Sequence, residues 1–197
     1  MSDPAQTLLE RDDLIEGLRA LVAELHRSTA TARIRIGGGA AIALTVDPDR
    51  AATVDIDAPS EPADTVRAAA AVIAARRGWR TDWLNDAAAV FVPTGYGRRA
   101  ASWQPVHDDG KVRIEIATPE TLLAMKLHAA QRRGNRDAPD LAVLLPTCGI
   151  TTVDQAAALY EDYYPGDSLT TRTERLLARL LAHPVATPQA APVPPLG

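Results

Sequence analysis

Two aspartates separated by one residue are the first candidates for chemistry in this chain. Asp55 and Asp57 belong to the alternating run Thr53-Val54-Asp55-Ile56-Asp57, which predicts a strand. Side chains two residues apart on a strand point to the same face, so the two carboxylates should converge. Converging carboxylates repel each other unless a cation lies between them, and such oxygen ligands suit Mg²⁺ or Mn²⁺. The alternative is a strand with one solvated, acidic face.

Three consecutive glycines, Gly37, Gly38 and Gly39, separate a predicted strand at 32–36 from a small-residue helix at 40–46. A turn of this kind exposes backbone N–H groups at a helix N-terminus, where free donors and the helix dipole bind phosphate. The spacing matches neither the dinucleotide fingerprint nor the Walker pattern, and three glycines also occur in simple tight turns. Beside two converging aspartates, however, they predict a phosphate cradle next to a metal site.

Two charged residues interrupt the apolar faces of later helices. The residues one turn before and after Lys126 are all apolar, so this lysine either extends to the surface or faces a cleft and contacts a triphosphate. Asp140 shares a helix face with apolar residues, where it either complements the helix dipole or belongs to the site. An ion pair between Lys126 and Asp140 across two neighbouring helices is a further expectation.

These side chains must be positioned by a mixed α/β region that is followed by helices. We expect strands at 32–36, 53–57, 90–92 and 112–117, and helices at 5–29, 40–46, 61–77, 119–131, 137–145, 152–163 and 169–182. The predicted organisation is an N-terminal helix (1–30), an α/β core (31–118), a helical region that completes the site (119–182) and a disordered Pro- and Ala-rich tail (183–197).

Composition narrows the class of protein. The 197 residues include 25 acidic and 21 basic side chains, a formal net charge of -4, which argues against broad phosphate-driven binding of nucleic acid. The single cysteine, Cys148, excludes an intramolecular disulfide and fits a reducing compartment. We find no secretory signal pattern and no long apolar run. The expectation is a cytoplasmic protein without a membrane partner.

The order of the motifs resembles bacterial nucleotidyltransferase-like proteins of the AbiEii/AbiGii abortive-infection toxin group, within the polymerase-beta-like nucleotidyltransferase superfamily. The motifs are Gly38-Gly39-Ala40, Thr53-x-Asp55-Ile56-Asp57, Met125-Lys126-Leu127-x-Ala129 and Arg136-Asp137-x-x-Asp140-Leu141, and they span residues 30 to 145. The resemblance implies an α+β, nucleotidyltransferase-like fold: a small mixed sheet flanked by helices, with a C-terminal helical region.

The same resemblance assigns roles to the candidate residues. It implies a catalytic set of Asp55, Asp57, Lys126 and Asp140, and a nucleotide-binding set of Gly37, Gly38, Gly39, Thr53 and Lys126. The divalent metal is assigned to Asp55 and Asp57. Because the superfamily often carries a third carboxylate on a later strand, Glu115 is the candidate third ligand, and Asp82 and Asp86 are its rivals.

The activity implied is metal-dependent transfer of an NMP from an NTP to a hydroxyl acceptor on RNA, tRNA or protein. A role as the toxin of a type IV toxin–antitoxin-like pair, with a cognate antitoxin as partner, belongs to the same expectation. Two alternatives remain open. One is a non-catalytic binding or regulatory module on the same fold. The other is a nucleotidyltransferase for small molecules of the aminoglycoside kind, because an acidic cleft suits a cationic acceptor.

Overall fold

The computed structural model describes residues 8–28 and 30–197 and confirms the α+β class. Its first helix, α1 (Arg11–Leu25), buries residues that recur at helical spacing: Leu14, Ile15, Leu18, Leu21, Val22 and Leu25. Glu10 and Asp13 cap its N-terminus reciprocally, each side chain accepting from the backbone of the other. The helix was expected at 5–29. Of that range, 5–7 and 29 lie outside the described residues, and 8–10 and 26–28 are not helical, because Leu9 pairs instead with Thr53 and the helix ends in a turn after Leu25.

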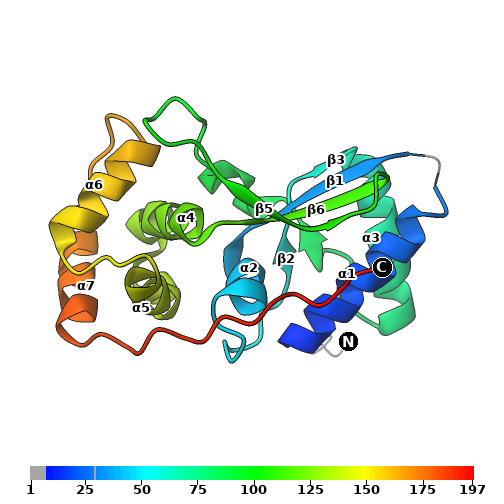
Figure 1. Cartoon of the computed structure of the whole chain (residues 1–197), viewed down its shortest axis with the longest axis horizontal. Coiled ribbons are helices and arrows are strands. Elements are labelled where there is room, and N and C mark those ends of the chain that lie inside the picture. Colours follow the sequence, from blue (N-terminus) through cyan, green and yellow to red (C-terminus); the bar gives the residue numbers. More distant parts are fainter. Residues whose placement is uncertain (1–7, 29) are drawn as a thin grey trace, which may run out of the picture.

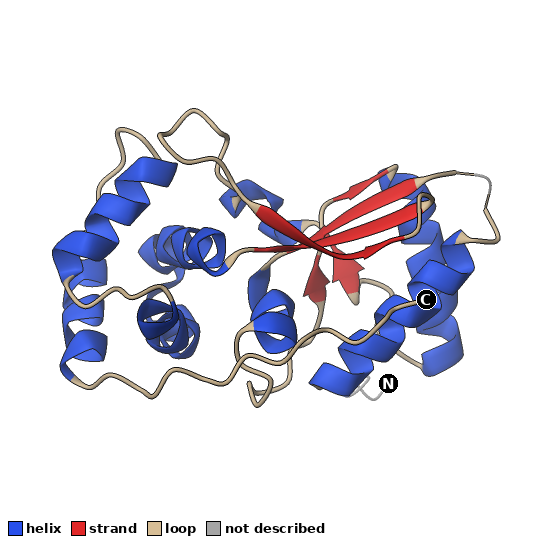
Figure 2. Ribbon diagram, in the orientation of Figure 1, coloured by secondary structure: helices blue, strands red, loops and turns tan. Residues whose placement is uncertain are grey.

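A mixed four-stranded sheet forms the centre of the N-terminal part, in the order β3 (Ser60–Glu61), β1 (Ala32–Ile36), β6 (Val112–Ala117), β5 (Trp103–Asp108). The two inner strands are parallel and both outer strands run antiparallel to them. The apolar side chains of β1 and β6 are buried on one face, and charged side chains alternate with them on the other. This alternation, predicted from the sequence, fixes which face carries the core. Figure 2 shows the strands of this sheet in red, with helices below them.

A second, short ribbon carries the aspartate motif. Strands β2 (Ile56–Asp57) and β4 (Leu84–Asn85) pair in parallel, with Asp57 opposite Asn85. Helix α2 (Gly38–Thr45) follows β1 directly and lies beside β2 (Figure 1). Helix α3 (Ala63–Arg77) connects the two strands of the ribbon and packs on α1.

The second half of the folded chain is helical, as predicted. Thr118 precedes α4 (Pro119–Arg133), and the first position of that helix is proline, which needs no N–H partner there. The chain continues through the 3-10 turn η2 (Gly134–Asp137), α5 (Ala138–Thr147), α6 (Val153–Tyr163) and α7 (Thr171–Ala182). Helix α4 contacts α5, α6 and α7, and on another side it contacts α2, so it joins the helical region to the sheet region (Figure 1).

Among residues 8–28 and 30–197, no helix combines the length and the apolar character that crossing a bilayer requires.

Residues 183–197, which were predicted to be a disordered tail, form no helix or strand, and most of them are exposed. The segment runs back from α7 along the molecule to α1 (Figure 1). Arg11 and Arg19 of α1 donate hydrogen bonds of 3.0 Å each to the carbonyl oxygens of Pro192 and Pro195. Leu196 is only 2% exposed. Its burial and these two hydrogen bonds hold a proline-rich segment without regular secondary structure.

Two predicted strands differ from the structure. The run 90–92 is not a strand, because Ala87–Phe91 forms the 3-10 helix η1, whose first N–H donates to the Asn85 side chain. Of the run 53–57, only residues 56–57 pair as a strand, while Thr53 forms an isolated bridge with Leu9. Strands β3, β4 and β5 were not predicted.

Candidate active site

The carboxylate of Asp57 lies directly against the glycine turn. The backbone N–H of Gly37 donates to the carbonyl of Asp57 at 2.9 Å, which joins the turn to strand β2. A Cβ atom placed on Gly38 would lie 2.5 Å from Oδ2 of Asp57, and Gly38 has a φ of +63°. Only glycine satisfies both the left-handed backbone and the close approach. Helix α2 therefore starts beside this carboxylate, and its first-turn N–H groups have no acceptor within the helix.

Asp55 lies close enough to Asp57 to influence the ionisation of Asp57. Burial, and next to it the charge of Asp55, raise the pKa of Asp57, while Lys126, Arg133 and an N–H from the backbone of Ala88 act in the opposite direction. Two carboxylates that act on each other in this way favour the arrival of a cation, and the convergence expected from the strand spacing stays a prediction.

Asp55 is held by a side chain of the neighbouring strand. The Nδ2 group of Asn85 donates to Oδ2 of Asp55 at 3.0 Å. The hydroxyl of Thr53 donates to the backbone carbonyl of Asp55 at 3.3 Å, so it supports the strand that carries the aspartates. Thr53 was expected to bind nucleotide, which stays a prediction; the contact seen here is the one to the backbone of Asp55.

Lys126 and Asp140 form the ion pair that the sequence suggested. The Nζ atom of Lys126 lies 2.8 Å from Oδ2 of Asp140 and 2.9 Å from Oδ1 of Asp137. All three side chains are largely buried. The lysine therefore does not extend to the surface, and its ammonium is fixed between α4 and the start of α5.

Arg50 belongs to this cluster, although the sequence analysis did not identify it. Its Nε and Nη2 atoms lie 2.7 and 3.2 Å from the two oxygens of Asp140, in the two-pronged geometry that arginine forms with carboxylates. A Cβ on Gly39 would lie 2.7 Å from Nη2 of Arg50, so the guanidinium also touches the glycine turn. Burial opposes the charge of Asp140, but the hydrogen bonds and charges of Arg50 and Lys126 outweigh it and lower the pKa of Asp140.

A small pocket of about 30 Å³ lies between these groups, bordered by Gly38, Asp57, Lys126, Arg133, Phe91 and Met125. The guanidinium of Arg133 is 4.6 Å from the centre of the Phe91 ring. A volume of this size holds a water molecule or an ion, not a nucleotide. A nucleotide placed on the glycine turn would therefore lie over the pocket and reach into it with its phosphates alone.

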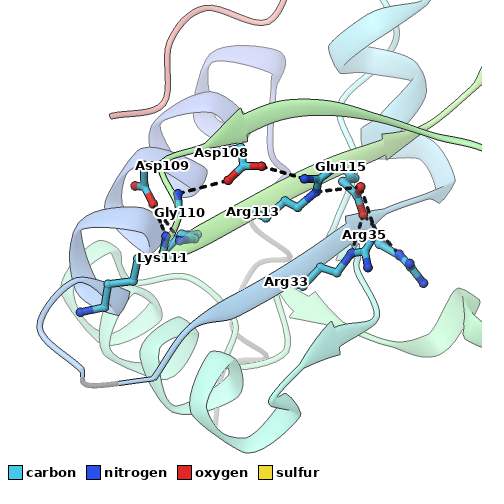
Figure 3. Close-up of polar contacts among 9 residues, drawn as sticks. Arg33, Arg35, Asp108, Asp109, Gly110, Lys111, Arg113 and Glu115 are labelled. Atoms are coloured by element: carbon cyan, nitrogen blue, oxygen red, sulfur yellow. Dashed lines mark hydrogen bonds and ion pairs between the residues drawn. The ribbon is translucent and has the colours of Figure 1, made fainter.

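Glu115 was expected to be the third metal ligand, and the structure does not bring it together with Asp55 and Asp57. It lies on the charged face of the sheet, where Nε atoms of Arg33, Arg113 and Arg35 approach its oxygens at 2.7, 3.0 and 3.3 Å (Figure 3). Chiefly through Arg33, and despite burial, these bonds lower the pKa of Glu115 to about 2. Three arginines already neutralise this carboxylate.

The rival carboxylates are not assembled with the aspartate pair either. Asp82 is exposed and forms a two-pronged pair with Arg80, at 2.8 and 2.6 Å, and Asp86 is exposed before η1. Across the described part of the chain, no three histidine, cysteine, aspartate or glutamate side chains are grouped to hold a metal. The oxygens of Asp55 and Asp57 nevertheless suit Mg²⁺ or Mn²⁺, if substrate phosphates and water complete the coordination shell.

Searches of protein-family models, of curated proteins and of solved structures found no match to this chain. The resemblance described from the motifs therefore remains a prediction, and the functional assignment depends on the geometry of the site.

Proposed function

We propose that this protein is a metal-dependent nucleotidyltransferase that moves an NMP from an NTP to a hydroxyl acceptor. The observation that carries the proposal is the position of Asp57. Its carboxylate touches the glycine turn at Gly38, shares its surroundings with Asp55, and lies within the field of Lys126 and Arg133. These contacts support the proposal, because phosphoryl transfer requires carboxylates, N–H donors and cations around one phosphate chain.

In this reading, Asp55 and Asp57 hold the divalent metal, which supplies charge stabilisation at the α-phosphate when bound. The N–H groups of Gly38 and Gly39, with Arg50 and Lys126, neutralise the remaining phosphates of the NTP. A bond forms between the acceptor oxygen and the α-phosphorus, and the bond to the β-phosphate oxygen breaks. Pyrophosphate leaves with that electron pair, and the proton of the hydroxyl passes to solvent.

Asp140 is a positioning residue in this proposal, not a general base. Both of its oxygens accept from Arg50, and Oδ2 also contacts Lys126. Engaged in this way and with a lowered pKa, it is a poor proton acceptor. Its effect is to hold two cations toward the glycine turn.

The experiment that tests the proposal is transfer of label from each α-³²P-labelled NTP, with Mg²⁺ or Mn²⁺. The acceptors are total RNA, lysate protein and a cationic aminocyclitol. We expect label in one acceptor class with the wild type and at least a hundredfold less with Asp57→Ala. Asp154→Ala, which removes an exposed acid in the first turn of α6, is the matched control. Absence of transfer to every acceptor, or equal transfer by Asp57→Ala, would overturn the proposal.

A non-catalytic nucleotide-binding module is the second candidate. It is favoured by the finding that no third carboxylate joins Asp55 and Asp57 within the described residues. Calorimetry with each NTP and Mg²⁺ separates the two candidates when read beside the transfer assay. Metal-dependent binding that disappears in Asp57→Ala, without transfer to any acceptor, would support the module. An antitoxin partner is proposed for both candidate functions, the nucleotidyltransferase and the non-catalytic module.

A further inference from the structure

The 3-10 helix η1 forms one wall of the small pocket beside Asp57. Its residues Ala88 and Phe91 border that pocket, and the N–H of Ala88 acts on the carboxylate of Asp57. Both residues are buried, but they pack with Met125 and Ala129 of α4 in a small cluster that is separate from the main core. Because this cluster buries little apolar surface, the position of η1 depends on further contacts.

Side chains anchor η1 at both of its ends. At the start, the backbone N–H of Ala87 donates to Oδ1 of Asn85 at 2.8 Å, and the Nδ2 group of the same asparagine donates to Asp55. At the end, the hydroxyl of Tyr164 donates to the backbone carbonyl of Phe91, 73 positions earlier in the chain. Asn85 belongs to the ribbon that carries the aspartates, whereas Tyr164 directly follows α6. The second anchor therefore comes from the helical region.

The ring of Tyr164 is itself held by two aromatic neighbours. It stacks on the ring of His128 of α4, with ring centres 4.5 Å apart and an angle of 15° between the planes, and it lies 5.0 Å from the ring of Tyr160. Nδ1 of His128 lies 2.8 Å from the hydroxyl of Tyr160, which joins the two neighbours to each other. Burial raises the pKa of Tyr164, so its hydroxyl stays protonated and remains a donor. The hydroxyl therefore has a fixed direction toward the end of η1.

We propose that Tyr164 is a positioning residue for the candidate active site: its hydroxyl fixes η1, and η1 keeps the pocket wall and the Ala88 N–H against Asp57. The inference rests on the proposed function, because a fixed wall matters to the site only if metal and phosphates bind there. A wall that is already ordered lowers the entropy cost of binding. The helical region would then support the site through Tyr164 as well as through Lys126.

Tyr164→Phe tests the anchor, because it removes the hydroxyl and keeps the stacked ring. Tyr163→Phe is the matched control: it removes the hydroxyl of the preceding residue, which lies 3.5 Å from Oγ1 of Thr121. Amide hydrogen exchange, measured by NMR on the full chain without metal or nucleotide, reports how firmly η1 is held. We expect the N–H of Ala88 to exchange about tenfold faster in Tyr164→Phe, as loss of one hydrogen bond implies, and at the wild-type rate in Tyr163→Phe.

Calorimetry then measures what the position of η1 contributes to the site. The ligand is the α,β-methylene analogue of each NTP with Mg²⁺, which binds without releasing pyrophosphate. We expect Tyr164→Phe to bind the analogue about fivefold more weakly than the wild type does, because η1 must then be ordered on binding. Tyr163→Phe should bind it as tightly as the wild type.

Three outcomes would overturn the inference. Unchanged exchange at Ala88 in Tyr164→Phe would show that the hydroxyl does not hold η1. Equal acceleration by Tyr163→Phe would indicate a general loosening around the end of α6. Faster exchange with undiminished binding of the analogue would show that η1 does not support the site. Because exchange is measured without ligand, it decides whether Tyr164 holds η1 even if the wild type binds no analogue, a result that would count against the proposed function instead.

Discussion

Asp57 is a carboxylate in surroundings that disfavour its charge. Burial and the neighbouring Asp55 raise its pKa above the ordinary 3.8. A raised pKa in the folded state means that the ionised side chain lowers the stability of the fold at neutral pH. A cation bound during function would offset this cost, because it would stabilise the ionised form of Asp57.

We therefore expect Asp57→Asn to be more stable than the wild type in the absence of divalent metal. The gain should be present at pH 7, and it should vanish as the pH falls below about 4, where the carboxyl is protonated in both the folded and the unfolded wild type. Urea unfolding over this pH range measures it. Added Mg²⁺ should stabilise the wild type and not the variant. A variant that is less stable than the wild type at pH 7 would contradict this account.

Glu115 shows the opposite electrostatics, since Arg33, Arg35 and Arg113 hold its pKa at about 2, below the ordinary 4.5. A lowered pKa contributes stability above pH 4.5 that is lost as the pH falls through 2. Glu115→Gln should therefore lower the free energy of unfolding by about 2 kcal/mol at pH 7, with a smaller difference at pH 3. Nucleotidyl transfer under folding conditions should be unchanged. If a stably folded Glu115→Gln variant lost nucleotidyl transfer, Glu115 would have to belong to the active site.

Sequence reasoning identified those candidate site residues whose charge is unexpected at their position in a helix. Lys126 and Asp140 are charged positions on apolar helix faces, and burial of such groups requires a partner, so their pairing could be expected. Arg50 carries no such signal, because an arginine in a turn is ordinary. Only the folded chain, which brings the turn after α2 to the first turn of α5, reveals its contact with Asp140. Glu115 was wrongly expected beside Asp55 and Asp57. Strand alternation predicts which face of the sheet a residue occupies, but it does not predict which other side chains lie on that face.

At the scale of elements, the start of α2 determines the geometry of the site. The turn places helix N–H groups and the Asp57 carboxylate side by side, and Gly38 makes this possible. Gly78, which ends α3, has a similar φ of +67°, but a Cβ added there would meet no atom within 4 Å. The two glycines thus share the same backbone requirement, and only Gly38 adds the contact with Asp57.

Gly38→Ala and Gly78→Ala are consequently a matched pair. Both should lose about 1 kcal/mol of stability, because alanine is disfavoured in the left-handed region. Only Gly38→Ala should also displace the Asp57 carboxylate, and metal-dependent NTP binding should fall at least tenfold. Thermal unfolding and calorimetry measure the two effects. Equal NTP binding by both variants would show that the glycine turn does not take part in NTP binding.

The elements that periodicity predicts well are the long ones. Helices α1, α3 and α4 and strands β1 and β6 present regular apolar faces, and they lie where the sequence placed them. Strand β5 was missed because its residues at 103–108 are mostly polar or half-buried and contain a proline, so no alternation marks it. The apolar run at 90–92 is too short for its period to distinguish a strand from a turn of helix.

At the scale of the whole molecule, residues 183–197 connect the end of the helical region to α1. Leu196 is buried, and two arginines of α1 hold the carbonyls near it. Proline-rich composition predicts disorder because such segments bury little apolar surface, but each proline is already restricted in conformation and loses less entropy on packing. Burial of one leucine and a few backbone contacts can then hold the segment.

Leu196→Ala should lower the free energy of unfolding by about 2 kcal/mol, as expected for truncation of a buried leucine. Leu8→Ala, at a side chain that is 56% exposed, is the control and should have little effect. Urea unfolding measures both variants. Equal stability of the two would show that the segment does not pack in solution.

The pairing of Arg50 with Asp140 has a consequence for how relatives of this chain should vary. The two residues are 90 positions apart, one beside the glycine turn and the other in the first turn of α5. Loss of either leaves a partly buried charge without its partner. Among homologues, the two positions should therefore change together, and a chimera that imports the helices of a relative should require the matching residue at position 50.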